Sequence, residues 1–210
     1  PIDRVERRSV QAYASAAPID KAALRGRLKA IERDSAAGQR DYALLAIYVN
    51  TGRRLSEVAA LTWSDVHQAG DRVTLYFRHA KGGKVMSDTL PAGISKALMT
   101  WLATAYGAQL GQLEPSAPIW VSQSTNGTAG QALGIRAVAQ ICADRLGVSK
   151  VHALRHTFAH MMEDAGAKTS EIQARLGHSS MATTGRYLAA LRAAENPYAE
   201  TLAQQLGLDD

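Results

Sequence analysis

Segments with helical periodicity make up most of the 210-residue chain, and polar breaks separate them. Helices are predicted over residues 20–33, 41–52, 56–63 and 94–106, and from about residue 131 to the end. The run DYALLAIYVNTG is apolar with few interruptions and predicts a helix that ends at Gly52. A stretch rich in Gly, Pro and Ser over 107–130, interrupted only by IWVS, predicts a long loop.

The period of the pattern changes between residues 63 and 94. RVTLYFRH (72–79) alternates apolar and polar residues and contains β-branched side chains. A second extended run, VMSDTLP, follows the sequence KGGK. Gly82 and Gly83 between the two runs predict the turn of a β-hairpin. The chain is therefore predicted to be mainly α-helical with a small antiparallel β-sheet or hairpin insert.

The pattern of hydrophobic and polar residues divides the chain into three predicted parts. Residues 1–18 are polar and predict an N-terminal tail or interdomain linker. Residues 19–195 contain no sharp break and are long enough to bury one substantial core, so they are predicted to be a single domain. Residues 196–210 predict a last helix, with Asn196 as its cap and Pro197 as its first residue.

Composition narrows the class of protein. Hydrophobic residues make up 46% of the chain and charged residues 20%, which is typical of a soluble globular protein. The net charge of +5 favours a polyanionic partner, and it also fits an ordinary solvated surface. Cys142 is the only cysteine, so an internal disulfide is excluded and a reducing cytosol is favoured. No stretch approaches the roughly 18 uncharged apolar residues of a membrane span.

The segment HALRHTFAH places His152, His156 and His160 at four-residue spacing, with Arg155 beside the middle one. On a helix this spacing puts the three rings along one face. Such a face is compatible with a metal site, with a catalytic site or with simple packing. A zinc site needs three or four ligands, and the H-E-x-x-H pattern is absent. The nine residues by themselves leave the three interpretations open.

Four further segments contain side chains that suit one chemistry. They are Arg53 and Arg54 in TGRRLSE, Lys81 and Lys84 in HAKGGK, His178 in LGHSS and Tyr187 in TTGRYL. Each has an ordinary structural explanation when it is taken alone. Together they provide what phosphoryl transfer requires: cations around the non-bridging oxygens, a nucleophile, and a proton donor for the leaving oxygen.

In order and spacing this set resembles the tyrosine recombinase (phage integrase) family over residues 20–195. The resemblance implies the catalytic-domain fold of the DNA breaking-rejoining enzymes. The catalytic residues it implies are Arg54, Lys81, His152, Arg155, His178 and Tyr187. The register places the family's first arginine at Arg54 and leaves Arg53 in a variable position. It also implies that His156 and His160 pack or hydrogen-bond behind the site.

The resemblance implies a role for each of the six residues. Tyr187 attacks a DNA phosphodiester and forms a 3′-phosphotyrosine, and Lys81 protonates the 5′ oxygen that leaves. The non-bridging oxygens are held by Arg54, Arg155 and His178. His152 accepts or relays the proton of Tyr187. We expect no metal, cofactor or ATP to take part.

The resemblance also implies partners. We expect the protein to act on double-stranded DNA as a tetramer, in the cytoplasm of a prokaryotic cell and with no membrane association. Family members usually carry an upstream helical domain that closes round DNA, and we expect that domain to be missing here, so that the isolated chain is monomeric. Residues 196–210 are predicted to dock on a neighbouring subunit, although their apolar stripe also fits a helix that covers its own domain.

Two other functions remain open at this point. A type IB topoisomerase uses the same phosphotyrosine chemistry but only relaxes DNA. A catalytically silent DNA-binding module would need none of the six residues. The intact set of six residues argues against the silent module, and strand exchange by a tetramer is what separates a recombinase from a topoisomerase. Site-specific recombination is the prediction.

Overall fold

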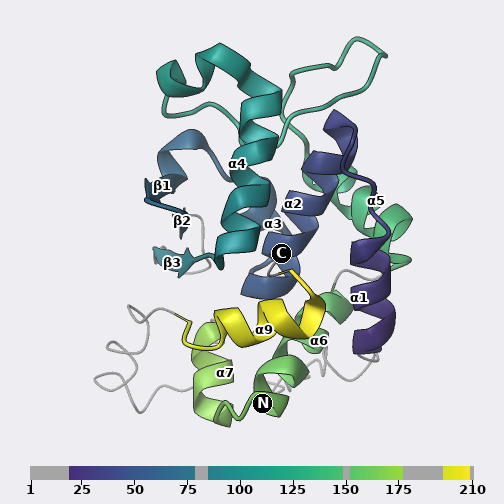
Figure 1. The fold of residues 1–210 in the computed structure, drawn as a ribbon, viewed down its shortest axis with the longest axis vertical. Coiled ribbons are helices and arrows are strands. Elements are labelled where there is room, and N and C mark those ends of the chain that lie inside the picture. Colours follow the sequence, from purple (N-terminus) through teal and green to yellow (C-terminus); the bar gives the residue numbers. More distant parts are fainter. Residues whose placement is uncertain (1–18, 79–84, 149–151, 177–195, 209–210) are drawn as a thin grey trace, which may run out of the picture.

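A computed structural model describes residues 19–78, 85–148, 152–176 and 196–208, and Figure 1 shows their arrangement. In chain order the described elements are α1 (Lys21–Lys29), α2 (Ala36–Thr51), α3 (Leu55–Ala59), the 3-10 helix η1 (Trp63–Asp65), β1 (Val66–Ala69), β2 (Arg72–Phe77), β3 (Met86–Thr89), α4 (Ala92–Tyr106), the 3-10 helix η2 (Gly107–Gln112), α5 (Ile135–Leu146), α6 (His152–Asp164), α7 (Thr169–Arg175) and α9 (Ala199–Leu206). The predicted mainly helical fold with a small antiparallel sheet is confirmed. Among the described helices, none has the length and apolar character that crossing a membrane requires.

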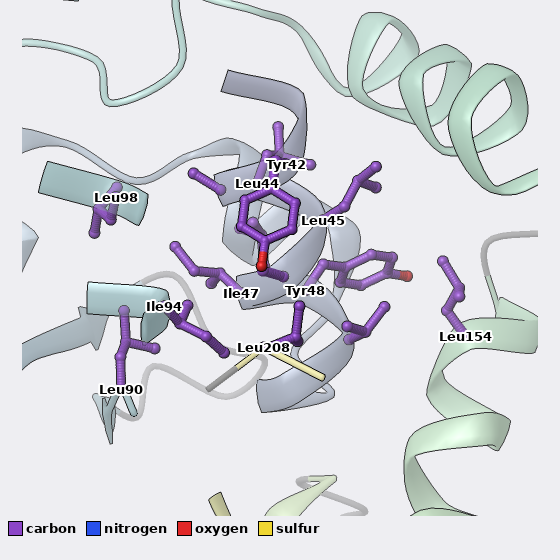
Figure 2. Close-up of a cluster of buried hydrophobic side chains, with 14 of the residues drawn as sticks. Tyr42, Leu44, Leu45, Ile47, Tyr48, Leu90, Ile94, Leu98, Leu154 and Leu208 are labelled. Atoms are coloured by element: carbon purple, nitrogen blue, oxygen red, sulfur yellow. The ribbon is translucent and has the colours of Figure 1, made fainter. Parts of the chain in front are cut away.

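The helix α2 runs through the centre of the described structure with other helices on several sides (Figure 1). Thirteen of its 16 residues are buried, so nearly every face of this helix contacts protein. Figure 2 shows Leu98 of α4 on one side of it and Leu154 of α6 on the other. Ser35 caps the helix, since its Oγ accepts a hydrogen bond from Gly38 N at 3.1 Å. This cap makes the helix begin before residue 41, where the apolar pattern places its start.

Three antiparallel strands, in the order β1-β2-β3, lie beside α4 (Figure 1). Val73, Leu75 and Phe77 are buried and alternate with half-buried residues along β2, which is the predicted alternation. Phe77 pairs with Met86, so the antiparallel pairing of the two predicted runs is confirmed as β2–β3. The predicted turn at Gly82 and Gly83 lies outside the described residues. The sequence pattern does not predict β1, because its residues VHQA are mostly exposed and have no apolar alternation.

The last helix, α9, packs against α1 and α2 of the same chain (Figure 1). Leu202 and Leu206 are fully buried there. Asn50 of α2 donates a hydrogen bond from Nδ2 to Ala199 O at 2.9 Å. The predicted apolar stripe is thus covered within one chain in this structure. Docking on a neighbouring subunit stays a prediction.

The predicted start of this helix at Asn196-Pro197 is wrong by two residues. The helix begins at Ala199, and Tyr198 occupies the cap position. Asn196 Oδ1 accepts a hydrogen bond from Tyr198 N at 3.1 Å. Asn196 therefore closes a turn ahead of the helix instead of capping it.

Candidate active site

The structure describes part of the predicted catalytic set. The side chains of Arg54 and Arg155 are described, and His152 is placed as the first residue of α6. Lys81, His178 and Tyr187 lie outside the described residues. The structure therefore shows the surroundings of Arg54 and Arg155, together with the segments next to the other predicted catalytic residues.

A sharp turn after α2 carries Arg53 and Arg54. Gly52 ends α2 in the left-handed region, with φ of +60°. A Cβ at Gly52 would lie 2.2 Å from the ring of Phe158 in α6. Glycine is needed both for the backbone conformation and for the close approach of α6. We call residues 52–54 the arginine turn, and Gly52 lets it pack directly against the helix that carries Arg155.

Arg53, the first arginine of this turn, points into the protein. It is 3% exposed, and its Nε donates to Asp88 Oδ2 at 2.6 Å. Its guanidinium also lies over the ring of Phe77, 5.3 Å from the centroid. These contacts give Arg53 a buried, structural position.

Arg54, the next residue, keeps its side chain 31% exposed. Its Nη1 donates to Glu57 Oε1 at 2.7 Å, and its backbone N–H donates to Glu57 Oε2 at 2.9 Å. Because the Glu57 side chain is only 3% exposed, the carboxylate is a fixed partner rather than a mobile surface group. Arg54 therefore presents an oriented guanidinium at the surface, whereas Arg53 does not.

Arg155 links the arginine turn to the end of α7. It is 5% exposed, its Nη1 donates to Gly52 O at 2.7 Å, and its Nη2 donates to Leu176 O at 2.8 Å. Along the chain, Gly52 is two residues before Arg54, and Leu176 is two residues before His178. One side chain of α6 therefore holds together two segments that each lead to another predicted catalytic residue.

Positive charge exceeds negative charge among the described residues of this region. The charged side chains are the guanidiniums of Arg53, Arg54, Arg155 and Arg175 and the carboxylates of Glu57 and Asp88. Burial lowers the pKa of Arg53 to about 10, and burial together with the charge of Arg53 lowers the pKa of Arg175 to about 9. Both guanidiniums remain protonated at neutral pH. A cluster with more cations than anions favours binding of an anionic group such as a phosphodiester.

The two other histidines of α6 have different surroundings. His156 is half-buried, as expected for a residue behind the site. The expectation that His160 packs or hydrogen-bonds behind the site is wrong: its side chain is 55% exposed, and Nδ1 lies 3.6 Å from Glu163 Oε2. Four-residue steps drift around a helix of 3.6 residues per turn, which carries His160 away from the buried side. Within the described segments, no three His, Cys, Asp or Glu side chains gather in a metal-binding arrangement.

Two residues of this region, Asp88 and Arg175, are missing from the set derived from sequence. Asp88 is 2% exposed on β3, and the residues two positions before and after it, Met86 and Leu90, are also buried. A carboxylate at an inward position of a strand requires a buried cation, so the alternation contained a usable signal. Arg175 gave no such signal, since basic residues are common in the last turn of a helix.

Comparison with known proteins places these features in a family. Residues 19–193 match the family model described as "Phage integrase family". The tyrosine recombinase XerC of Xanthomonas campestris pv. campestris (strain B100) is 34% identical over 169 residues, which cover 77% of this chain and 48% of the relative. XerC of Pelobacter propionicus is 31% identical over 156 residues, which cover 71% of this chain and 47% of the relative. The chain thus spans about half the length of the curated relatives it matches.

Solved structures agree in fold. The crystal structure of XerA recombinase has a TM-score of 0.61 at 23% identity, with 90% of this chain and 64% of that chain covered. The XerH site-specific recombinase bound to its difH substrate, in a pre-cleavage complex, has a TM-score of 0.56 at 23% identity, with 82% of this chain and 47% of that chain covered. At this level of identity the likeness establishes the shared fold.

Proposed function

The chain belongs to the phage integrase family, and from that premise we propose that it cleaves and rejoins DNA as the catalytic domain of a site-specific tyrosine recombinase. The observation that carries the proposal is the ordered set of six catalytic residue types within the matched residues 19–193. The oriented, partly exposed Arg54, two residues after the Gly52 carbonyl that the buried Arg155 binds, supports it.

The proposed cleavage step is an in-line displacement at phosphorus. The Tyr187 oxygen forms a bond to phosphorus while the bond from phosphorus to the 5′ oxygen breaks, which leaves a 3′-phosphotyrosine and a 5′ hydroxyl. Lys81 gives a proton to the leaving oxygen, and His152 accepts or relays the proton of Tyr187. A 5′ hydroxyl from a partner duplex then reverses the step, so religation needs no ATP. The same residues serve in both directions.

The proposed roles of the arginines follow from their surroundings. Arg54, Arg155 and His178 stabilise the charge on the non-bridging oxygens. Glu57 restricts the Arg54 side chain, and two backbone carbonyls restrict Arg155. Cationic donors that are already oriented stabilise a transition state more than mobile ones, because less reorganisation accompanies the reaction. This geometry supports phosphodiester chemistry without a metal ion.

We propose double-stranded DNA as the substrate and a tetramer on DNA as the active assembly, in the cytoplasm of a prokaryotic cell. The net charge of +5 suits a polyanionic substrate. The XerH structure was determined with its difH substrate bound, which makes DNA the natural first ligand to test. The isolated chain is proposed to be monomeric without DNA.

Trapping on nicked duplexes tests the proposed activity. A pool of suicide duplexes with randomised sequence around the nick is incubated with the chain, and complexes that survive denaturation are collected. We expect a covalent protein–DNA adduct through a 3′ phosphate. DNA binding without any adduct would identify a silent binding module, and adducts that never yield recombinant products between two duplexes would identify a topoisomerase.

Lys81 is proposed as the general acid, and a substrate with sulfur at the 5′ bridging position tests it. A thiolate leaves without a proton, so this substrate is expected to restore cleavage by Lys81→Ala and not by Arg155→Ala. The measurement is the rate of adduct formation on oxygen- and sulfur-bridged suicide duplexes. Lys84→Ala is the matched control from the same KGGK sequence. Rescue of Lys84→Ala alone would assign the role to Lys84.

The C-terminal helix is proposed to exchange between subunits during assembly. In the single chain α9 covers its own α1 and α2, and docking on a neighbour would couple cleavage to assembly. Deleting residues 197–210 is expected to lower the urea midpoint, since buried Leu202 and Leu206 are lost, and to leave a cooperative transition. The same deletion is expected to reduce pairing of two duplexes. Unchanged pairing, or loss of the folded state, would assign α9 to its own domain.

A further inference from the structure

A buried carboxylate lies where three segments of the described structure meet. Asp88 is 2% exposed on β3, and Arg53 Nε of the arginine turn donates to its Oδ2 at 2.6 Å. Arg175, the last residue of α7, forms an ion pair with the other oxygen, Oδ1. We call these three residues the Asp88 cluster. It joins a strand, a turn and a helix end that are far apart in the sequence.

We expect the cluster to contribute more to geometry than to stability. Removing three charged groups from water is costly, and apolar side chains of similar volume stabilise a core at least as well. Guanidinium–carboxylate pairs differ from apolar contacts because they fix direction as well as distance. Burial lowers the pKa values of Arg53 and Arg175 but leaves both guanidiniums charged at neutral pH. A single carboxylate thereby fixes two cationic side chains.

The segments that the cluster joins are those of the proposed active site. Arg53 is adjacent in the chain to Arg54, and Asp88 lies in the strand that follows the KGGK sequence. Leu176 directly follows Arg175, and its carbonyl accepts a hydrogen bond from Arg155 Nη2. Arg155 binds the opposite end of the arginine turn at Gly52 O. The turn is therefore held at Gly52 by Arg155 and at Arg53 by Asp88.

We propose that Asp88 is a positioning residue that, through Arg53 and Arg175, fixes the arginine turn so that Arg54 is aligned with Arg155 for the cleavage step. This inference rests on the proposed recombinase function. Asp88 acts through other residues and touches no DNA atom itself. Loss of the cluster is expected to slow chemistry while DNA binding persists.

Asp88→Asn tests the proposal, because asparagine has the same shape and lacks the charge. The matched control is Asp41→Asn. Asp41 is 3% exposed and also binds two arginines, Arg40 at 2.7 Å and Arg145 at 2.9 Å, but it lies on α2 and joins α5 instead of the arginine turn. Both variants are expected to unfold at a lower urea concentration than the wild-type chain.

The discriminating readout is single-turnover adduct formation on a suicide duplex at saturating DNA, measured alongside DNA affinity. Asp88→Asn is expected to slow adduct formation by about tenfold to a hundredfold with unchanged affinity, because small misplacements of catalytic groups have effects of that size. Asp41→Asn is expected to react at the wild-type rate. If Asp88→Asn does not fold, Arg175→Lys, which keeps the charge and loses the planar fork, is measured instead with the same expectation.

The outcomes separate this inference from the proposed function. If the wild-type chain forms no adduct on any duplex of the pool, the proposed function fails. If the wild-type chain forms adducts and Asp88→Asn does so equally fast, the positioning role is wrong and the function stands. Equal slowing of Asp88→Asn and Asp41→Asn would also refute the positioning role, since it would reflect stability alone.

Discussion

Replacing Tyr187 with phenylalanine is expected to abolish the covalent protein–DNA adduct. The substitution removes only the phenolic oxygen, which is the atom proposed to bond to phosphorus. Without that oxygen the chain has no route to a phosphotyrosine, whereas the cationic residues that hold the phosphate are unchanged. The measurement is the fraction of labelled suicide duplex that stays bound to protein after denaturation. Non-covalent binding, followed by fluorescence anisotropy, is expected to remain close to that of the wild-type chain.

Tyr198→Phe is the matched control for this experiment. Tyr198 lies in the same C-terminal part of the chain, and its hydroxyl donates to Glu171 Oε2 at 3.3 Å. Its loss is expected to leave adduct formation intact. An adduct formed by Tyr187→Phe would refute the assignment of the nucleophile. Loss of the adduct in Tyr198→Phe alone would transfer that role to Tyr198.

Replacing Arg54 with alanine is expected to slow cleavage by about 10²- to 10³-fold, the typical effect of losing one preorganised donor at a developing charge. The reason is that Arg54 is the member of the arginine turn whose guanidinium reaches the surface, where Glu57 orients it. The rate of adduct formation at saturating DNA measures the effect. Glu57→Gln is expected to produce a smaller loss, since it weakens orientation but keeps the charge of Arg54.

Arg145→Ala is the control for Arg54→Ala. Arg145 is 40% exposed and pairs with the buried Asp41, and Arg54 is 31% exposed and pairs with the buried Glu57. The two substitutions therefore remove comparable ion pairs and are expected to have similar effects on the urea midpoint. Cleavage at the wild-type rate by Arg54→Ala, or an equal loss in Arg145→Ala, would contradict the catalytic role of Arg54.

Arg155→Ala is expected to slow cleavage at least as much, but it gives a less specific test. The same side chain donates to the carbonyls of Gly52 and Leu176, and leaving buried polar groups unpaired costs about 1–3 kcal/mol each. The variant is therefore expected to lose stability as well as activity. A urea titration measured beside the cleavage rate separates the two losses.

The sequence alone determined the kind of protein and most of its elements. Helical periodicity and the alternation over 72–79 predicted the helices and the β2–β3 hairpin, because periods of 3.6 and 2 are local properties of a chain. The ordered set from Arg54 to Tyr187 indicated the family, which the match over residues 19–193 established. The start of α2 and the start of α9 were misplaced, because single side-chain hydrogen bonds at Ser35 and Asn196 decide them.

Tertiary structure alone decided which surroundings each charged residue has. Arg53 and Arg54 are adjacent, identical and equally polar in any local pattern, yet one is buried against Asp88 and the other is directed to the surface by Glu57. Their difference depends on β3 and α7, which lie far away in the sequence. The exposure of His160 and the link from Arg155 to Leu176 depend in the same way on how α6 packs. Ion-pair partners are set by contacts between distant segments, so local periodicity does not identify them, even where it indicates burial, as at Asp88.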